Sequence, residues 1–272
     1  LTFAVNAKNG PVPNRVPTIA PLKLTGASID VDAPTSAGLY EYIDPVEIES
    51  ALAASEAEGI GDIITSWLVP APIEKPWGMG FDGTNVWISD INTRVNHIVT
   101  PEGIHTGRMF KAVWAASWPG DMAFDSRHNL MWQVNVGGDN GVYGMDPETG
   151  ATVCCIDTGA WTDISQRGLA YCSDDDTFYI GGWNENIIYH FKGIDWDNPG
   201  EIIDQWAFPH SIAGLEWHPS GLLWVTSNAQ WDMIYAVDPV THAVIESIVN
   251  PGTKEYTGAG LAIDSEGNLW VM

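Results

Sequence analysis

The sequence has little positive charge and no long apolar run. Only 11 of its 272 residues are lysine or arginine, against 35 aspartate or glutamate, so the formal net charge is −24. Nucleic acids and anionic membrane surfaces attract basic proteins, so we expect neither as a partner. No stretch of 18 consecutive apolar residues is present, so we expect no membrane insertion. Bound cations, basic partners or simple solubility are compatible with the acidic balance.

Cysteine is also scarce. Cys154 and Cys155 are adjacent in one predicted strand, and Cys172 lies in the next one. Neighbouring residues of a strand point to opposite faces of a sheet, so at most one of the pair readily faces Cys172. Three thiolates are too few for the usual four-thiolate zinc site. We therefore expect buried free thiols rather than a disulfide.

Familiar catalytic signatures are missing as well. The sequence contains no Ser-His-Asp pattern, no nucleotide-binding glycine loop and no HExxH motif. No apolar run keeps a helical period. What the chain does have is 14 tryptophans, 28 glycines and 45% hydrophobic residues, enough for a large core in one domain spanning residues 1–272.

One phrase recurs along the chain: a glycine, a short apolar run, a polar turn and a second apolar run. Copies recur about every 45 residues, which is the spacing of propeller blades. The copies are GMGFDGTNVWIS (78–89), GDMAFDSRHNLMWQV (120–134), GLAYCSDDDTFYIG (168–181), GLEWHPSGLLWVT (214–226) and GLAIDSEGNLWVM (260–272). We expect Trp87, Trp132, Trp224 and Trp270 to pack between blades, and turns such as DGTN, HPSG and DSEG to be structural.

Two more apolar runs complete each unit. The third ends in a turn, as in VYGMDPETG (142–150) and IYAVDPVTH (234–242), and the fourth resembles ATVCCID (151–157). These runs are rich in Val, Ile, Tyr and Trp and are bounded by turn residues, which is typical of β-strands. A four-stranded unit cannot bury both faces alone, whereas units stacked around an axis can. The sequence therefore predicts an all-β propeller.

The blade count depends on the N-terminal region. Residues 18–45 align with 211–239, so we interpret them as a degenerate blade whose fourth strand is 62–69. Residues 1–6 and 12–18 then supply the third and fourth strands of a closing blade begun by 260–272. Sharing one blade between both chain ends removes an exposed sheet edge. We predict six blades; five is the alternative, if the N-terminal match is coincidental.

Residues 46–61, VEIESALAASEAEGIG, break the repeat pattern. Glutamate, alanine and leucine dominate the segment, and Ile48, Leu52 and Ala53 share one face of a helix. We predict a short helical insertion within a blade, either as surface decoration or as a docking helix for a partner.

Phrases such as GLAIDSEGNLWVM and PSGLLWVTSNAQWDMIYAVDP resemble the repeats of one group of β-propellers. This group contains the NHL-repeat proteins, the regucalcin/gluconolactonase family and the virginiamycin B lyase-like proteins. The resemblance covers most of the chain. It implies either a lactonase or lyase that holds a divalent metal on the axis, or a non-catalytic binding module. No metal-ligand set of the enzymes can be matched residue by residue.

In a propeller the fourth-to-first and second-to-third connections share one face around the channel. Exposed aromatic rings flanked by amides and carboxylates suit sugars or a peptide. The candidate ligand-binding residues on this face are Trp77, Trp118, Asp121, Trp161, Asp163, Arg167, Trp183, Asn184, His210, Asn228 and Trp231.

Asp121 is the most unusual of these residues, because four other units have glycine at its position. Arg167 lies one position earlier in its own unit, and both positions approach the axis. Asp121, Asp90 and Asn135 could supply oxygen ligands for Ca²⁺ or Mg²⁺. The alternative for Asp121 is a carboxylate that caps a turn.

These observations favour a non-catalytic propeller that binds a protein, peptide or carbohydrate ligand on its loop face. The alternative is a divalent-metal-dependent lactonase, hydrolase or lyase of the gluconolactonase type. We expect a monomeric, extracellular or cell-surface protein. Because residue 1 is leucine, we expect a processed chain or a piece of a longer one.

Overall fold

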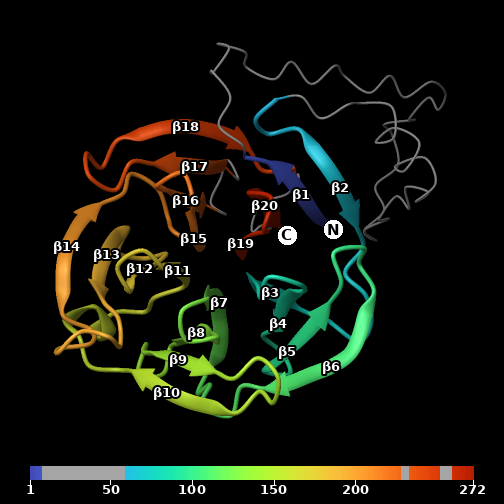
Figure 1. Cartoon of the computed structure of the whole chain (residues 1–272), viewed down its shortest axis with the longest axis horizontal. Coiled ribbons are helices and arrows are strands. Elements are labelled where there is room, and N and C mark those ends of the chain that lie inside the picture. Colours follow the sequence, from blue (N-terminus) through green and yellow to red (C-terminus); the bar gives the residue numbers. More distant parts are fainter. Residues whose placement is uncertain (8–58, 228–232, 252–258) are drawn as a thin grey trace, which may run out of the picture.

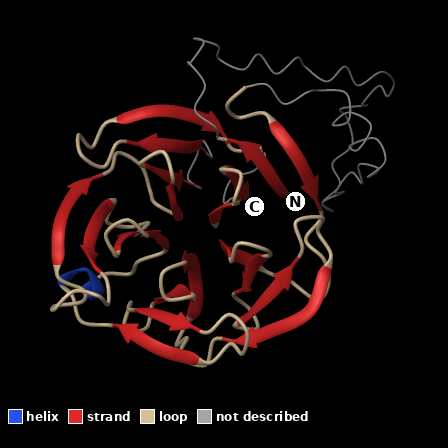
Figure 2. Ribbon diagram, viewed as in Figure 1, coloured by secondary structure: helices blue, strands red, loops and turns tan. Residues whose placement is uncertain are grey.

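The computed structural model describes residues 1–7, 59–227, 233–251 and 259–272. Its strands form five four-stranded antiparallel sheets arranged in a ring around one axis (Figure 1), which is a β-propeller. The first strand of each blade lies nearest the axis and the fourth lies at the outside. Among the described residues, helix is confined to one 3₁₀ turn, η1 (Ala160–Asp163) (Figure 2), and no helix is long and apolar enough to cross a membrane.

The blades are numbered in chain order and their strands are given from the axis outward. Blade 1 contains β3 (Pro76–Phe81), β4 (Val86–Asp90), β5 (Val95–Val99) and β6 (His105–Lys111), and blade 2 contains β7 (Trp118–Asp125), β8 (Leu130–Val136), β9 (Val142–Met145) and β10 (Thr152–Ile156). Blade 3 contains β11 (Gly168–Cys172), β12 (Thr177–Gly181), β13 (Ile187–Lys192) and β14 (Ile202–Ala207), and blade 4 contains β15 (Gly214–His218), β16 (Leu222–Ser227), β17 (Met233–Val237) and β18 (Val244–Val249). Blade 5 contains β19 (Leu261–Ile263), β20 (Asn268–Val271), β1 (Thr2–Asn6) and β2 (Ile63–Trp67).

Blade 5 confirms that strands from both chain ends close the ring. Ala4 of β1 pairs with Trp270 on one side and with Thr65 on the other. The prediction of six blades is wrong, and the five-bladed alternative holds. Strand β2 was expected to end a degenerate blade, but it pairs with β1 as the fourth strand of blade 5. Both assignments use the same apolar run, and only the pairing partner distinguishes them.

Several N-terminal predictions lie outside the described residues. These are the degenerate blade over 18–45, the strand over 12–18 and most of the helix over 46–61. Of that predicted helix, residues 59–61 are described, and they form a bend and a turn instead. Gly61 N–H donates to the carbonyl oxygen of Asn6 (2.8 Å), which leads the chain into β2.

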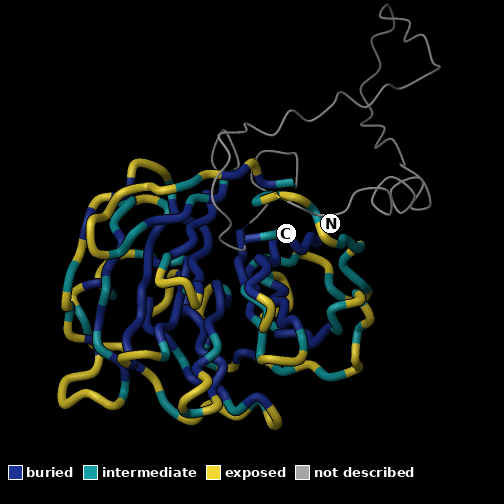
Figure 3. The backbone as a smooth tube through the Cα atoms, turned by 45° about the horizontal axis from the view of Figure 1, so that its top comes forward, coloured by how far each residue is buried: buried dark blue, intermediate teal, exposed yellow. Residues whose placement is uncertain are grey.

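Burial follows position within the blade. Strands β4, β8, β11 and β12 are buried along their whole length, because neighbouring blades cover both faces (Figure 3). The outer strand β14 alternates between more and less exposed residues, as expected at the edge of the ring. All three cysteines are free, as expected, but only Cys172 is buried and Cys155 is exposed.

A carboxylate of the repeated turn accepts a hydrogen bond from the tryptophan that follows the turn. Three pairs join a turn carboxylate to an indole N–H in the next strand: Asp82 with Trp87 (2.7 Å), Asp125 with Trp132 (3.2 Å) and Asp264 with Trp270 (3.2 Å). In blade 4 the turn begins with His218 instead, and the buried indole N–H of Trp224 has no hydrogen-bond partner among the described residues. The four repeat tryptophans are at most 3% exposed, which confirms their expected packing.

Candidate functional site

Four of the predicted residues meet on one face of the ring. Trp77 and Trp118 stand at the beginnings of β3 and β7, Arg167 immediately precedes β11, and Trp183 follows β12. First strands begin, and second strands end, on the same face of a propeller. We call this the loop face, and we call these four residues the rim cluster.

The guanidinium of Arg167 is the centre of the rim cluster. Its Cζ atom lies 5.6 Å from the ring centroid of Trp77, 5.4 Å from that of Trp118 and 5.3 Å from that of Trp183. Trp77 and Trp118 also contact each other edge to face, with centroids 5.0 Å apart. All four side chains are partly exposed. Three indoles thus contribute cation–π attraction to one cation, which is worth about 0.5–2 kcal/mol per favourable contact.

Arg167 has a fixed backbone, and its guanidinium has no ion-pair partner among the residues that the structure describes. Its N–H donates to the carbonyl oxygen of Gly181 (2.8 Å), and its own carbonyl oxygen accepts the N–H of Asp121 (3.0 Å). Within the described residues, no carboxylate pairs with the guanidinium and no acceptor takes a hydrogen bond from it. Burial lowers the pKa of Arg167. An anion at this point would restore the hydrogen bonds that the guanidinium lacks.

Asp121 lies on the axis beneath the rim cluster and is fully buried. Its Oδ1 accepts the backbone N–H of Met79 (3.1 Å) and of Leu261 (3.3 Å). Its Oδ2 accepts the N–H of Leu215 (3.0 Å) and, at 3.5 Å, that of Leu169. Each donor belongs to the innermost strand of a different blade. One carboxylate therefore satisfies edge donors from all four other blades.

The repeat glycines allow this convergence. A Cβ atom at Gly78 would overlap the carbonyl oxygen of Gly120, and one at Gly214 would overlap that of Ala259. The inner strands thus approach too closely for side chains at these positions. In blade 2 the corresponding residue is Asp121 instead of glycine, and its side chain occupies the axis.

Glu216 is a second buried acid near the axis, and the sequence interpretation missed it. It is 8% exposed and directly follows Leu215. Burial, and then the charge of Asp121, raise the pKa of Glu216 well above its usual value. Burial likewise raises the pKa of Asp121, against the opposing effect of its four backbone hydrogen bonds. The sequence contained a signal that could have identified Glu216, because the other units have glycine or alanine at its position.

Each of the three predicted metal ligands has hydrogen-bond partners of its own. Asp90 caps its own connection by accepting backbone N–H groups from Glu74, Asn92 and Thr93. Asn135 accepts the N–H of Ala116 through Oδ1 (3.1 Å) and donates to Asp139. The oxygens of Asp121 face backbone donors rather than other oxygen ligands.

The remaining predicted residues are dispersed. Trp161 is fully buried, stacks on Phe191 (4.4 Å between centroids) and donates to the carbonyl oxygen of Gly200, so a ligand cannot reach its ring. His210 is exposed and stacks on Tyr235 at 4.6 Å. Asp163 and Asn184 are exposed. Asn228 and Trp231 lie outside the described residues.

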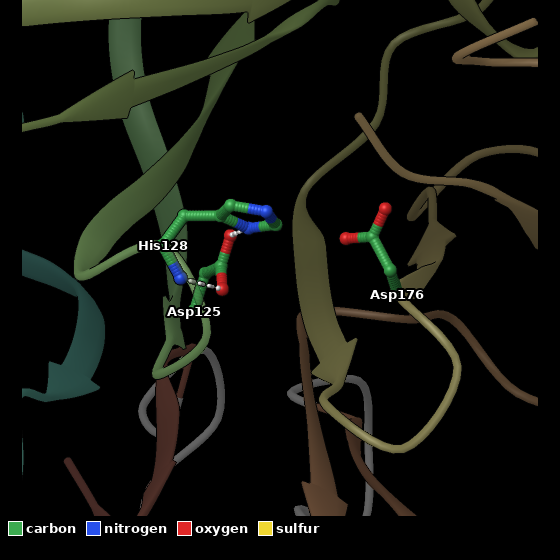
Figure 4. Close-up of side chains that lie close together, drawn as sticks. All are labelled: Asp125, His128 and Asp176. Atoms are coloured by element: carbon green, nitrogen blue, oxygen red, sulfur yellow. Dashed lines mark hydrogen bonds and ion pairs between the residues drawn. The ribbon is translucent and has the colours of Figure 1, made fainter. Parts of the chain in front are cut away.

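A different cluster lies on the opposite face, where Asp125, His128 and Asp176 come from the first turns of blades 2 and 3 (Figure 4). His128 Nδ1 lies 2.7 Å from Asp125 Oδ2, and its Nε2 lies 3.0 Å from Asp195 Oδ1. Asp176 accepts the hydroxyl of Tyr171 (2.9 Å) and the N–H of Asp195 (2.6 Å). These atoms lie close enough to hold a metal ion, but each already takes part in a hydrogen bond. The contacts join blade 2 to blade 3.

No protein-family model matches the sequence, and no curated protein matches it. Among solved structures, the chain is similar to the hydrazine synthase of Kuenenia stuttgartiensis, with a TM-score of 0.46 and 16% sequence identity. The match covers 73% of this chain and 54% of that one, so the chain spans about half the length of that protein. At this identity and TM-score the likeness carries no conclusion about this chain.

Proposed function

We propose that this protein is a non-catalytic β-propeller that binds a carbohydrate or peptide ligand on its loop face. The observation that carries the proposal is the rim cluster, where three partly exposed indoles surround one guanidinium that has no ion-pair partner in the described part of the chain. Apolar surface combined with a few oriented polar groups is the usual composition of a binding site. We also propose that the protein acts as a monomer, at the cell surface or outside the cell.

The buried carboxylate of Asp121, which we call the hub, lies beneath the rim cluster and supports binding rather than turnover. The carboxylate of Asp121 holds the inner strands of the other four blades, so the rim above it is built on a rigid base. Rigid elements preorganise a binding surface. General acid–base catalysis requires a titratable group within reach of the substrate. The two acids at the axis, Asp121 and Glu216, are buried, so neither is well placed for this role.

Glycan and peptide arrays test the proposal. We expect wild-type protein to select ligands from one class, and Trp118→Ala to abolish their binding. Trp196→Ala is the matched control, because Trp196 is 40% exposed and lies outside the rim cluster. Arrays without any ligand, or ligands that Trp118→Ala retains, would count against the proposal. Turnover of sugar lactones, with a thermal midpoint raised by Ca²⁺ or Mg²⁺ and lowered by EDTA, would favour the metal-dependent enzyme instead.

A further inference from the structure

We propose that Arg167 binds a carboxylate group and that the ligand carrying it is a uronic acid unit of a carbohydrate. This inference rests on the function proposed above and specifies the chemistry of the ligand. It goes beyond a general binding surface, because it assigns a charge, a functional group and a shape to the ligand.

The first argument is the state of the guanidinium. An arginine offers five N–H donors in one plane, and none of the described residues accepts a hydrogen bond from those of Arg167. The indole faces of Trp77, Trp118 and Trp183 attract the charge but do not accept hydrogen bonds in the guanidinium plane. A carboxylate matches that plane with two parallel N–H···O bonds, which are roughly twice as strong as neutral ones.

The second argument concerns the charge of the ligand. The protein has a net charge of −24, so its overall field repels anions and repels multiply charged ones most. A ligand with one carboxylate gains the local contacts with Arg167 and experiences the least electrostatic repulsion from the rest of the protein. One guanidinium that lacks an anionic partner among the described residues, in an acidic protein, therefore favours a monoanion over a phosphate or a sulfated polymer.

The third argument concerns shape. A pyranose ring has a flat face of C–H groups that stacks on an indole, and a uronic acid carries its carboxylate at the edge of that ring. The rim cluster places three partly exposed indole rings around the guanidinium of Arg167. The exposed amide of Asn184 adjoins Trp183 and is available to sugar hydroxyls. The side chain of an acidic peptide residue has no flat face next to its carboxylate, so the cluster favours the sugar.

The test is a calorimetric titration of purified protein with methyl glucuronide and with the neutral methyl glucoside. We expect wild-type protein to bind the glucuronide at least about tenfold more tightly, as a hydrogen-bonded charge pair implies. Arg167→Gln should remove the difference between the two sugars, and Arg167→Lys should restore only part of it because lysine lacks the planar fork. Arg108→Gln is the matched control, since Arg108 also lies over an aromatic ring, that of Phe110. It should bind as wild type does.

Equal affinity for the two sugars, or a preference that survives Arg167→Gln, overturns the inference. An N-acetyl-aspartate amide that binds more tightly than the glucuronide overturns the assignment to a sugar. If neither sugar binds while the arrays identify a ligand for the loop face, the inference is wrong and the proposed function stands. If the arrays are also empty, both are wrong. Thermal midpoints of the variants, compared with that of wild type, establish that each one is folded.

Discussion

The carboxylate of Asp121 accepts the backbone N–H of Leu215, which lies 94 residues further along the chain, at 3.0 Å. This contact crosses the axis from blade 2 to blade 4. Three other inner strands donate to the same carboxylate, so a single side chain ties the ring together at its centre. The binding surface that we propose is built directly above this hub.

Asp121→Asn is expected to destabilise the protein strongly. One of the two oxygens would become an NH₂ group facing backbone N–H donors, which leaves buried donors unsatisfied. We expect a loss of about 2–4 kcal/mol in the free energy of unfolding, measured with urea. Asp163→Asn, at an exposed position on the same face, is the control and should stay within about 0.5 kcal/mol of wild type. Equal stability of the two variants would show that the hub contacts do not matter.

Much of the fold could be predicted because the repeat is a local pattern. The phrase that begins at Gly78 and recurs through Gly260 specified two strands and a turn each time, and the first three strands of the closing blade followed from its incomplete copies at the two ends. The fourth strand of that blade, predicted over 12–18, is β2 instead. The blade count could not be predicted in the same way. An apolar run such as residues 63–67 fits the fourth strand of any blade, and only its pairing with β1 decides which one.

The site was predicted less evenly than the fold. Asp121 was detected because it departs from the repeat, and Glu216 could have been found by the same comparison. Sequence also placed Arg167 and the tryptophans on one face, but it could not separate Trp161, which the 3₁₀ turn η1 directs into the core. The His128 cluster was missed because its turns are individually structural and meet only when two blades pack.

Glu216→Gln is expected to stabilise the protein at neutral pH. Burial, followed by the charge of Asp121, raises the pKa of Glu216, so the folded state disfavours its ionised form. The resulting penalty is absent below the ordinary pKa of 4.5 and grows as the pH rises through the folded-state value. Urea unfolding at several pH values should give similar stabilities near pH 4 and an advantage for Glu216→Gln of about 1–2 kcal/mol at pH 7. An advantage that does not change with pH would contradict the assignment.

His128 should also make the stability of the protein depend on pH, but above pH 6.5. Burial lowers the pKa of His128, but its hydrogen bonds with Asp125 and Asp195 and their charges raise it overall above 6.5. A protonated His128 therefore stabilises the fold below pH 6.5, and this contribution is lost as the pH rises through the folded-state pKa. Thermal midpoints of wild type and His128→Gln, compared from pH 5 to pH 8, should converge at the upper end. A constant or widening gap would exclude this role for His128.

Trp224→Phe should cost less stability than Trp87→Phe. Both substitutions remove similar volume from a buried site, but Trp87 donates its indole N–H to Asp82, whereas the buried indole N–H of Trp224 finds no acceptor in the described ranges. Removing an unpaired donor relieves a desolvation penalty, while removing a paired one leaves an acceptor unsatisfied. We expect the two variants to differ by about 1–3 kcal/mol in urea unfolding. A larger loss for Trp224→Phe would be the opposite of this expectation.

The most direct test of the proposed binding surface is an NMR titration that follows the indole N–H signals of all 14 tryptophans while a ligand selected on the arrays is added. We predict that the signals of Trp77, Trp118 and Trp183 shift with a common affinity, while those of the buried Trp87, Trp132 and Trp270 stay in place. If the rim signals do not move and other tryptophans respond instead, the ligand binds elsewhere and the rim cluster is not the site.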